Sequence, residues 1–287
     1  MTVLVTGATG TVAAPLVADL ARRRVPTRAF VRDPAKARRM LGESVELAVG
    51  DFGEPPSIRR ALAGVDQVFL ACANDRRQVA YEMDVIDAAA EAGVRRLVKL
   101  SAVGAEVGSP AHYWDWHGRI EAYLRDSRLP ATVLRPTFYL TNLLANADAV
   151  RHTGTLFAPA EGAKIAMIDP RDVAAAAAAV LTTPEHDGRT YTLTGPEAVT
   201  FDDVAACLTT ATGRAVSFVA VPDPVALDGL RQAGLPSWVA EQLVTVFGQL
   251  RQGVAAHPTD TVQALTGRPA RSLLAFAADH ARAFRPS

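Results

Sequence analysis

Three small residues near the amino terminus have the spacing of a turn that binds phosphate groups. Gly7, Gly10 and Ala13 follow a short apolar run at residues 3–5 and open a stretch with apolar side chains at Val12 and Leu16. Backbone N–H groups at a helix start can hold phosphate oxygens if no Cβ blocks close approach. The third position tolerates alanine because its role is helix–strand packing. The pattern predicts a dinucleotide-binding turn, and a plain strand-to-helix connection is the alternative.

Charged residues about 20 positions after the glycines indicate which dinucleotide the turn would bind. An acidic residue there would bind the ribose 2′-hydroxyl of NAD, whereas an arginine would favour the 2′-phosphate of NADP. Arg32 and Asp33 both lie at this point, but Asp33 before Pro34 is a natural helix cap. Arg32 has no such structural task, and Lys36 adds positive charge one turn later. We therefore predict NADP(H), with NAD(H) as the alternative.

The elements that must position these residues alternate between short apolar runs and helical stretches. Runs near residues 3–5, 27–31, 45–49, 68–71, 97–100 and 132–134 predict strands, and a helix is expected from about residue 116 to 126. Short apolar runs without polar alternation are typical of strands buried on both faces. The sequence therefore predicts an α/β fold with a doubly wound, parallel Rossmann-type sheet, whose ligand lies beyond the carboxyl ends of its strands.

The last third of the chain has a different pattern. Residues 156–168 resemble a small hairpin, residues 189–194 predict a strand that rejoins the sheet, and helices interrupted by glycine and proline follow Thr200. We predict a dinucleotide-binding domain over residues 1–155 together with the strand at 189–194. Residues 156–188 and 195–287 would form a smaller, mostly helical lid over the substrate.

Composition and charge exclude several classes of partner. Lys and Arg balance Asp and Glu at 30 each, and aromatic residues make up 6% of the chain, so neither nucleic acid nor a membrane is an expected partner. The two cysteines, Cys72 and Cys207, lack metal-ligand spacing, so we expect free thiols and no metal site. No apolar leader follows Met1, which favours a cytoplasmic location. We expect a monomer or a homodimer.

Motifs along most of the chain resemble the NmrA-like branch of the short-chain dehydrogenase/reductase superfamily. They are VLVTGATG, RAFVRDPAKA, GDF, VFLACA, LVKLSAVGA, WHGRIEAYLRDSRLPATVLRPTFYLTNLL, DPRDVAAAAAAVL and GRTYTLTGPEAVT. The set is specific for this branch, although no single motif is. The branch includes NADPH-dependent quinone reductases, reductases of azo and triphenylmethane dyes, and redox-sensing regulators that bind the dinucleotide without turnover.

The resemblance implies a cofactor site at the carboxyl ends of the strands, with the nicotinamide near residues 137–139. Asp51 would reach the adenine edge or serve only as a turn residue, and Arg135 is expected to pair with an internal carboxylate. With Lys36 added from the charge pattern, the expected cofactor-binding residues are Gly7, Thr9, Gly10, Thr11, Val12, Arg32, Lys36, Asp51, Phe52, Ala71, Cys72, Ala73, Ser101, Thr137 and Phe138.

One position departs from the main superfamily, in which a lysine four residues after a tyrosine lowers the pKa of that proton donor. Ser101 and Tyr113 have suitable spacing, but His117 stands where the lysine is expected. Tyr113 and His117 remain candidate catalytic residues, and His117 could instead be a half-buried structural histidine. Reduction of a quinone creates a phenolate, which needs less help from an acid than an alkoxide does. The missing lysine therefore favours quinones, azo groups and similar conjugated acceptors.

Aromatic residues near this helix and after the sixth strand could enclose a flat substrate or belong to the core. The candidate substrate residues are Trp114, Trp116 and Tyr139. We predict an NADPH-dependent reductase that transfers hydride to a quinone-like or polycyclic aromatic acceptor. Two alternatives stay open: a dinucleotide-sensing regulator without turnover, and an enzyme that modifies an aromatic secondary metabolite such as a polyketide, for instance within a two-component oxidation.

Overall fold

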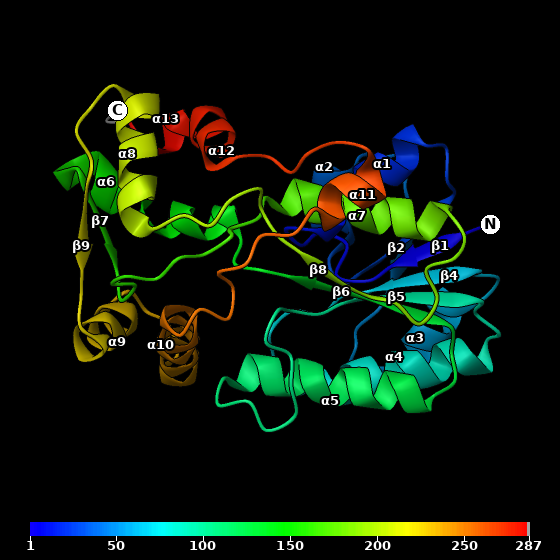
Figure 1. The fold of residues 1–287 in the computed structure, drawn as a ribbon. Helices are drawn as coiled ribbons and strands as arrows, with labels where there is room; N and C mark the ends of the chain where they lie inside the picture. The colour runs from blue at the N-terminus through cyan, green and yellow to red at the C-terminus, as the bar shows by residue number, and fades with distance from the viewer. Residues whose placement is uncertain (286–287) are drawn as a thin grey trace.

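A computed structural model describes residues 1–285, and two sheets organise this part of the chain (Figure 1). The larger sheet has seven strands in the order β3-β2-β1-β4-β5-β6-β8, and all of its neighbouring pairs are parallel. Its strands are β1 (Val3–Val5), β2 (Thr27–Val31), β3 (Glu46–Val49), β4 (Gln67–Leu70), β5 (Arg96–Leu100), β6 (Ala131–Pro136) and β8 (Thr190–Leu193). The predicted Rossmann-type sheet is confirmed, and β8 joins it beside β6.

Helices cover both faces of this sheet (Figure 1). One face carries α1 (Ala13–Arg22), α2 (Pro34–Leu41), α7 (Pro170–Thr182) and α11 (Thr261–Thr266), and the other carries α3 (Pro55–Leu62), α4 (Gln78–Glu91) and α5 (His112–Asp126). Successive residues of β1 enter different cores, Val3 and Val5 with residues of α1 and α7, Leu4 with residues of α3 and α4. Burial on both faces explains why these strands lack polar alternation.

Helix α7 is placed differently from the prediction that residues 156–188 belong to the lid. It packs against α1, and Val173, Val180 and Leu181 share a core with β1. Its run of alanines is buried almost all round, because small side chains let the helix approach both the sheet and α1 closely. A helix that is apolar on every side gives no stripe from which to infer its partner. The division of the remaining chain between domain and lid stays a prediction.

The carboxyl-terminal part forms a second unit, drawn away from the sheet in Figure 1. The predicted hairpin at residues 156–168 is wrong: β7 (Thr155–Ala158) pairs in parallel with β9 (Ser217–Ala220), a strand that lies about 60 residues later and that local patterns do not reveal. Phe201 and Phe276 lie in the core of this unit. Its other elements are a 3₁₀ helix (Leu140–Asn146), α6 (Ala147–Thr153), α8 (Phe201–Thr212), α9 (Asp223–Gln232), α10 (Ser237–Arg251), α12 (Leu273–Asp279) and α13 (Ala281–Phe284).

Helix α5 begins at His112, one turn earlier than predicted. Its first turn holds Tyr113 and Trp114, aromatic residues with modest helix propensity that are both buried. Tertiary packing of these rings therefore extends the helix toward its amino terminus. As a result Tyr113 and His117 lie one helical turn apart on the same side of α5.

Candidate active site

The glycine turn between β1 and α1 has the geometry that a pyrophosphate requires. Gly7 has a φ of +57°, and a Cβ at this position would lie 2.8 Å from the carbonyl oxygen of Ala71. Within the turn, Gly10 N–H donates to Gly7 O at 2.7 Å. The N–H groups of residues 11–13 have no acceptor within residues 1–285, as is usual at a helix start. These free donors and the missing Cβ fit a dinucleotide phosphate.

The end of β4 lies directly beside this turn. Thr6 Oγ1 accepts a hydrogen bond from Ala71 N and donates one to Ala71 O, both at 2.9 Å. Ala71 is buried, Cys72 is half-buried and Ala73 is exposed, so the chain rises to the surface here. The structure thus brings the predicted residues 71–73 next to the glycine turn. The role of Thr6 in joining the two strands was not foreseen, because a threonine at a strand end has no distinctive spacing.

Arg32 follows β2 and extends into solvent. Its side chain is 76% exposed, and its Nε lies 3.8 Å from Asp51 Oδ2. Asp33 accepts a hydrogen bond from Lys36 N at 2.9 Å, which confirms its role as a helix cap. Asp51 also accepts a hydrogen bond from Gly53 N at 2.7 Å, the contact expected of a turn residue. The carboxylate of Asp33 is therefore engaged as the cap of α2. The side chain of Arg32 is exposed and can turn toward a ligand.

Phe52 and the three residues that follow β6 are held by different kinds of contact. Phe52 is half-buried and stacks on Tyr81, with ring centroids 6.0 Å apart. Thr137 Oγ1 donates to Ala166 O at 2.6 Å, and the Phe138 ring lies 5.8 Å from that of Phe247. Tyr139 packs beside the core under α7, and burial raises the pKa of its hydroxyl. Residues 137–139 thus connect the sheet to the second unit.

Ser101, at the end of β5, is held by a buried carboxylate. Its Oγ donates to Glu121 Oε1 at 2.5 Å, and Arg135 Nε donates to the same oxygen at 3.0 Å. A second guanidinium nitrogen of Arg135 pairs with Glu121 Oε2. The expectation that Arg135 pairs with an internal carboxylate is confirmed. Because Ser101 already donates to Glu121, its hydroxyl can only accept from a further ligand.

A chain of buried polar groups, absent from the sequence-based candidates, leads from α4 to His117. Lys99 Nζ lies 2.9 Å from Glu82 Oε2 and 3.1 Å from His117 Nδ1, and Gln78 Nε2 donates to Glu82 Oε1 at 3.0 Å. The side chains of Lys99 and Glu82 are fully buried. Burial, and then the positive charge of Lys99, lower the pKa of His117 well below its ordinary value. This network could have been inferred from Lys99, which lies in an otherwise apolar run. A lysine that is buried in such a strand requires a charged partner.

Tyr113 belongs to an aromatic cluster instead of a hydrogen-bond network. Its ring centroid lies 5.6 Å from Trp116 and 6.2 Å from Trp238 of α10, and these two tryptophans are 6.1 Å apart. No group within residues 1–285 hydrogen-bonds to its hydroxyl, and burial raises the pKa of that hydroxyl. Trp238 was not predicted to belong to this cluster because it lies more than 100 residues after Tyr113 in the sequence. Trp114 packs under Gly104 and is buried, so its ring belongs to the core.

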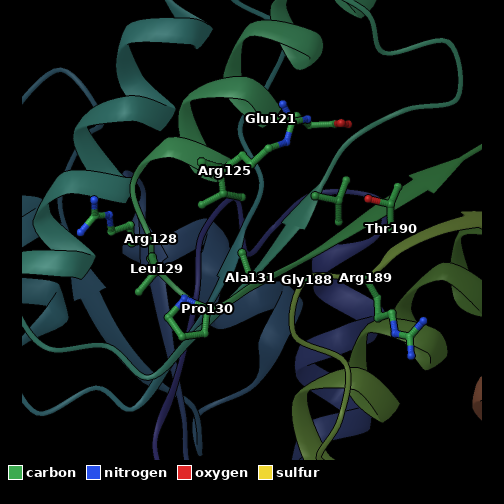
Figure 2. A pocket seen from close by; sticks show the side chains of 11 residues that line it. Glu121, Arg125, Arg128, Leu129, Pro130, Ala131, Gly188, Arg189 and Thr190 are labelled. Atoms are coloured by element: carbon green, nitrogen blue, oxygen red, sulfur yellow. The ribbon is translucent and has the colours of Figure 1, made fainter.

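A cavity of about 250 Å³ lies elsewhere, between α5 and the neighbouring strands β6 and β8 (Figure 2). Ala131 and Thr190, which line it, are the first residues of β6 and β8, so the cavity lies at the amino ends of these strands. Ligands of doubly wound sheets bind at the opposite, carboxyl ends. The candidate active site is therefore the region around the glycine turn, residues 71–73 and the start of α5.

Residues 1–285 contain neither a membrane-spanning helix nor a cluster of metal ligands. No helix in this range is both long enough and apolar enough to cross a bilayer. No three His, Cys, Asp or Glu side chains in this range gather in a way that could hold a metal ion. Cys72 and Cys207 are free and half-buried.

The parallel sheet and the glycine turn define a protein of the Rossmann dinucleotide-binding class. Residues 1–268 match the NmrA-like family, and the chain belongs to this family, as the sequence motifs predict. An NAD(P)H azoreductase from Xenophilus azovorans is 37% identical over 282 residues, which cover 98% of this chain and 99% of the relative. A (4-alkanoyl-5-oxo-2,5-dihydrofuran-3-yl)methyl phosphate reductase from Streptomyces griseus is 40% identical over 288 residues, which cover 99% of each chain.

A solved structure shows the same likeness. The crystal structure of an NADPH-dependent quinone oxidoreductase from Escherichia coli complexed with NADPH has a TM-score of 0.89 and 30% sequence identity. The match covers 96% of this chain and 99% of that one. The predicted class, an NAD(P)H-dependent oxidoreductase, is the class of these relatives, and the predicted cofactor is the one bound in that complex.

Proposed function

We propose that this chain is an NADPH-dependent reductase that transfers hydride to a quinone-like or similarly conjugated, flat acceptor. The observation that carries the proposal is the state of the two residues available for proton transfer. The hydroxyl of Tyr113 lies in an aromatic cluster where burial raises its pKa, and the pKa of His117 is lowered. Neither residue is therefore poised to protonate an alkoxide near neutral pH.

A weak acid is sufficient only for some acceptors. The bound dinucleotide supplies a hydride, and the acceptor then carries a negative charge that must be stabilised. A simple ketone would become an alkoxide, whereas a quinone becomes a phenolate, which water can protonate later. The acceptors in the names of the relatives, quinones, azo compounds and an acylated oxo-dihydrofuran, are all electron-poor and conjugated.

The preference for NADPH is supported by Arg32 and by the position of Asp33. The Arg32 guanidinium is exposed and only loosely paired with Asp51, so it can turn to a 2′-phosphate with bidentate geometry. The Asp33 carboxylate caps α2 and is not available to bind the 2′-hydroxyl of NAD. Lys36 lies exposed in the first turn of α2 and adds positive charge.

The acceptor would bind against the cluster of Tyr113, Trp116 and Trp238. Trp116 and Trp238 are half-buried and keep part of their ring surface accessible. Aromatic faces stack on flat conjugated molecules with little loss of conformational entropy. The cluster also joins α5 to α10, so the second unit contributes directly to this surface.

The test is NADPH oxidation, followed by absorbance, with a naphthoquinone, an azo dye, a conjugated furanone and a simple ketone, and with NADH in parallel. We expect turnover of the conjugated acceptors, little with the ketone, and faster reaction with NADPH. Equal rates for quinone and ketone would contradict the argument from the missing acid. Tight NADPH binding without turnover of any acceptor would instead favour a dinucleotide-sensing regulator.

A further inference from the structure

Lys99 is a buried lysine whose ammonium contacts three polar groups. Its ammonium lies 2.9 Å from Glu82 Oε2 and 3.1 Å from His117 Nδ1, and it donates to the carbonyl oxygen of Leu100. Lys99 comes from β5, Glu82 from α4 and His117 from α5, so the group joins three elements. A fully buried lysine is retained only where partners offset the loss of hydration. This geometry constrains the histidine as well as the lysine.

An ammonium group has only donors, so each of its partners must accept. His117 Nδ1 must therefore carry a lone pair toward Lys99, and the single hydrogen of the neutral imidazole resides on Nε2. A second hydrogen on Nδ1 would point at the ammonium 3.1 Å away. The Glu82 carboxylate forms an ion pair with Lys99 and balances its charge.

The other ring nitrogen faces outward. His117 Nε2 has no hydrogen-bond partner within residues 1–285, yet it is not among the buried unpaired side-chain atoms of that range. The ring is half-buried, so its Nδ1 side meets the buried lysine and its Nε2 side is accessible. His117 also lies one turn after Tyr113, in the part of α5 that carries the aromatic cluster.

We propose that Lys99 is a positioning residue that holds His117 neutral with its hydrogen on Nε2, so that His117 donates a hydrogen bond to bound dinucleotide or acceptor instead of transferring a proton. This inference rests on the proposed function for the identity of the ligand, but not for the state of the ring. It assigns Glu82 the task of anchoring the ammonium.

Other ionisable groups lie near this network and would influence it. Cys72 lies at the end of β4. Burial and the charge of Glu82 raise the pKa of its thiol, while the charge of Lys99 lowers it, so the thiol stays neutral. Along α5 itself, Tyr113 lies four residues before His117 and Glu121 four residues after it. Glu121 is paired with Arg135, so its charge is balanced. The ammonium of Lys99 is therefore the charged group in direct contact with the Nδ1 side of the ring.

The first test is the long-range ¹H–¹⁵N spectrum of ¹⁵N-histidine-labelled protein without ligand. A His117→Gln variant identifies the His117 signals, and the exposed His152 and His257 give reference signals. We expect the Nε2–H tautomer of neutral imidazole with no titration between about pH 5.5 and pH 8. The Nδ1–H tautomer, or titration of His117 within this range, would overturn the proposal, whether or not the protein turns over any acceptor.

The second test removes the ammonium and its counter-charge together, in a Lys99→Met/Glu82→Gln variant. Thermal unfolding and circular dichroism would establish that this variant folds, and the spectrum of the unmodified protein remains decisive if it does not. We expect the pKa of His117 to rise by at least about one unit, a tenfold change in its proton affinity. The pH profile of kcat would gain an inflection at that pKa. An unchanged pKa in the folded variant would refute the role of Lys99.

The third test asks whether Nε2 reaches the ligand. Adding NADP⁺ to the labelled protein should shift the Nε2 signal of His117 and leave that of His152 unchanged. If the binding of NADP⁺ is visible by fluorescence quenching or calorimetry but neither NADP⁺ nor an added quinone moves the His117 signal, the donor role is wrong. Failure of the proposed reductase function alone would leave these spectra unaffected.

Discussion

Replacement of Gly7 by alanine tests the phosphate turn directly, because two separable effects act at this residue. Gly7 has a φ of +57°, and an added Cβ would lie 2.8 Å from Ala71 O. Gly64 is a matched control, since its φ is +71° but an added Cβ would meet nothing within 4 Å. Both substitutions impose the left-handed conformation on alanine, and only Gly7→Ala adds a backbone clash.

The expected destabilisation follows from these two effects. A left-handed conformation costs alanine about 1–2 kcal/mol, and loss of glycine's freedom in the unfolded chain offsets about 0.4–1 kcal/mol of this. Gly64→Ala should therefore lower the free energy of unfolding by at most about 1.6 kcal/mol. The clash at Gly7 involves a backbone carbonyl that cannot rotate away, so it should add about 1–3 kcal/mol, as overpacking does.

Urea unfolding and a fluorescence titration with NADPH measure the two consequences. Gly7→Ala should unfold at a clearly lower urea concentration than Gly64→Ala. Displacement of the turn from the end of β4 should also raise the Kd for NADPH by at least about tenfold, or 1.4 kcal/mol, whereas Gly64→Ala should leave it unchanged. If the two variants have the same stability and the same Kd, the turn does not bind the pyrophosphate in the way described.

Three further predictions concern the cofactor, the acceptor and a thiol. Arg32→Ala should lower the preference for NADPH over NADH by about tenfold to a hundredfold, because charged hydrogen bonds are lost; the exposed Arg22→Ala is the control, and an unchanged preference would refute the assignment. Trp238→Ala should raise the KM for a quinone by about tenfold or more without changing the Kd for NADPH, since two aromatic contacts disappear; a selective loss of NADPH binding would contradict this. Burial raises the pKa of the Cys72 thiol from 9.0 to about 12, so the folded state favours the neutral thiol, and this stabilisation is present below about pH 9 and lost as the pH rises toward 12. In a Cys207→Ser variant, alkylation of Cys72 at pH 8 should be about a thousandfold slower in the folded protein than in urea, and equal rates would refute the shift.

Much of the fold could be predicted because its determinants are local. The apolar runs give all seven strands of the large sheet, and the cap at Asp33 accepts the hydrogen bond expected of it. The parallel pair of β7 and β9 was missed because its two strands have no local connection. The packing of helix α7 against α1 was not foreseen because an alanine run with no polar side gives no indication of its partner.

The site was predictable where backbone geometry decides it, and not where distant side chains meet. Gly7 and Arg32 could be proposed as cofactor-binding residues from their spacing after the first strand, since the turn and the strand order fix both positions. Trp238 and Glu82 could not, because their roles depend on contacts across the fold with Tyr113 and Lys99. Lys99 lies in the apolar run at residues 97–100, where it is the charged residue. Its charge alone did not show which residues would surround it.

The position of this lysine explains the chemistry proposed for the site. A lysine four residues after a tyrosine would lower the pKa of the hydroxyl, but here the ammonium is on β5, faces His117 and is balanced by Glu82. Tyr113 consequently receives no help from a positive charge, and burial raises its pKa. Burial and then the same ammonium lower the pKa of the neighbouring imidazole, and in the proposed arrangement a hydrogen-bond donor replaces a proton donor. Under the proposed function, such a site would stabilise a delocalised anion better than it would protonate a localised one, and it would therefore favour conjugated acceptors.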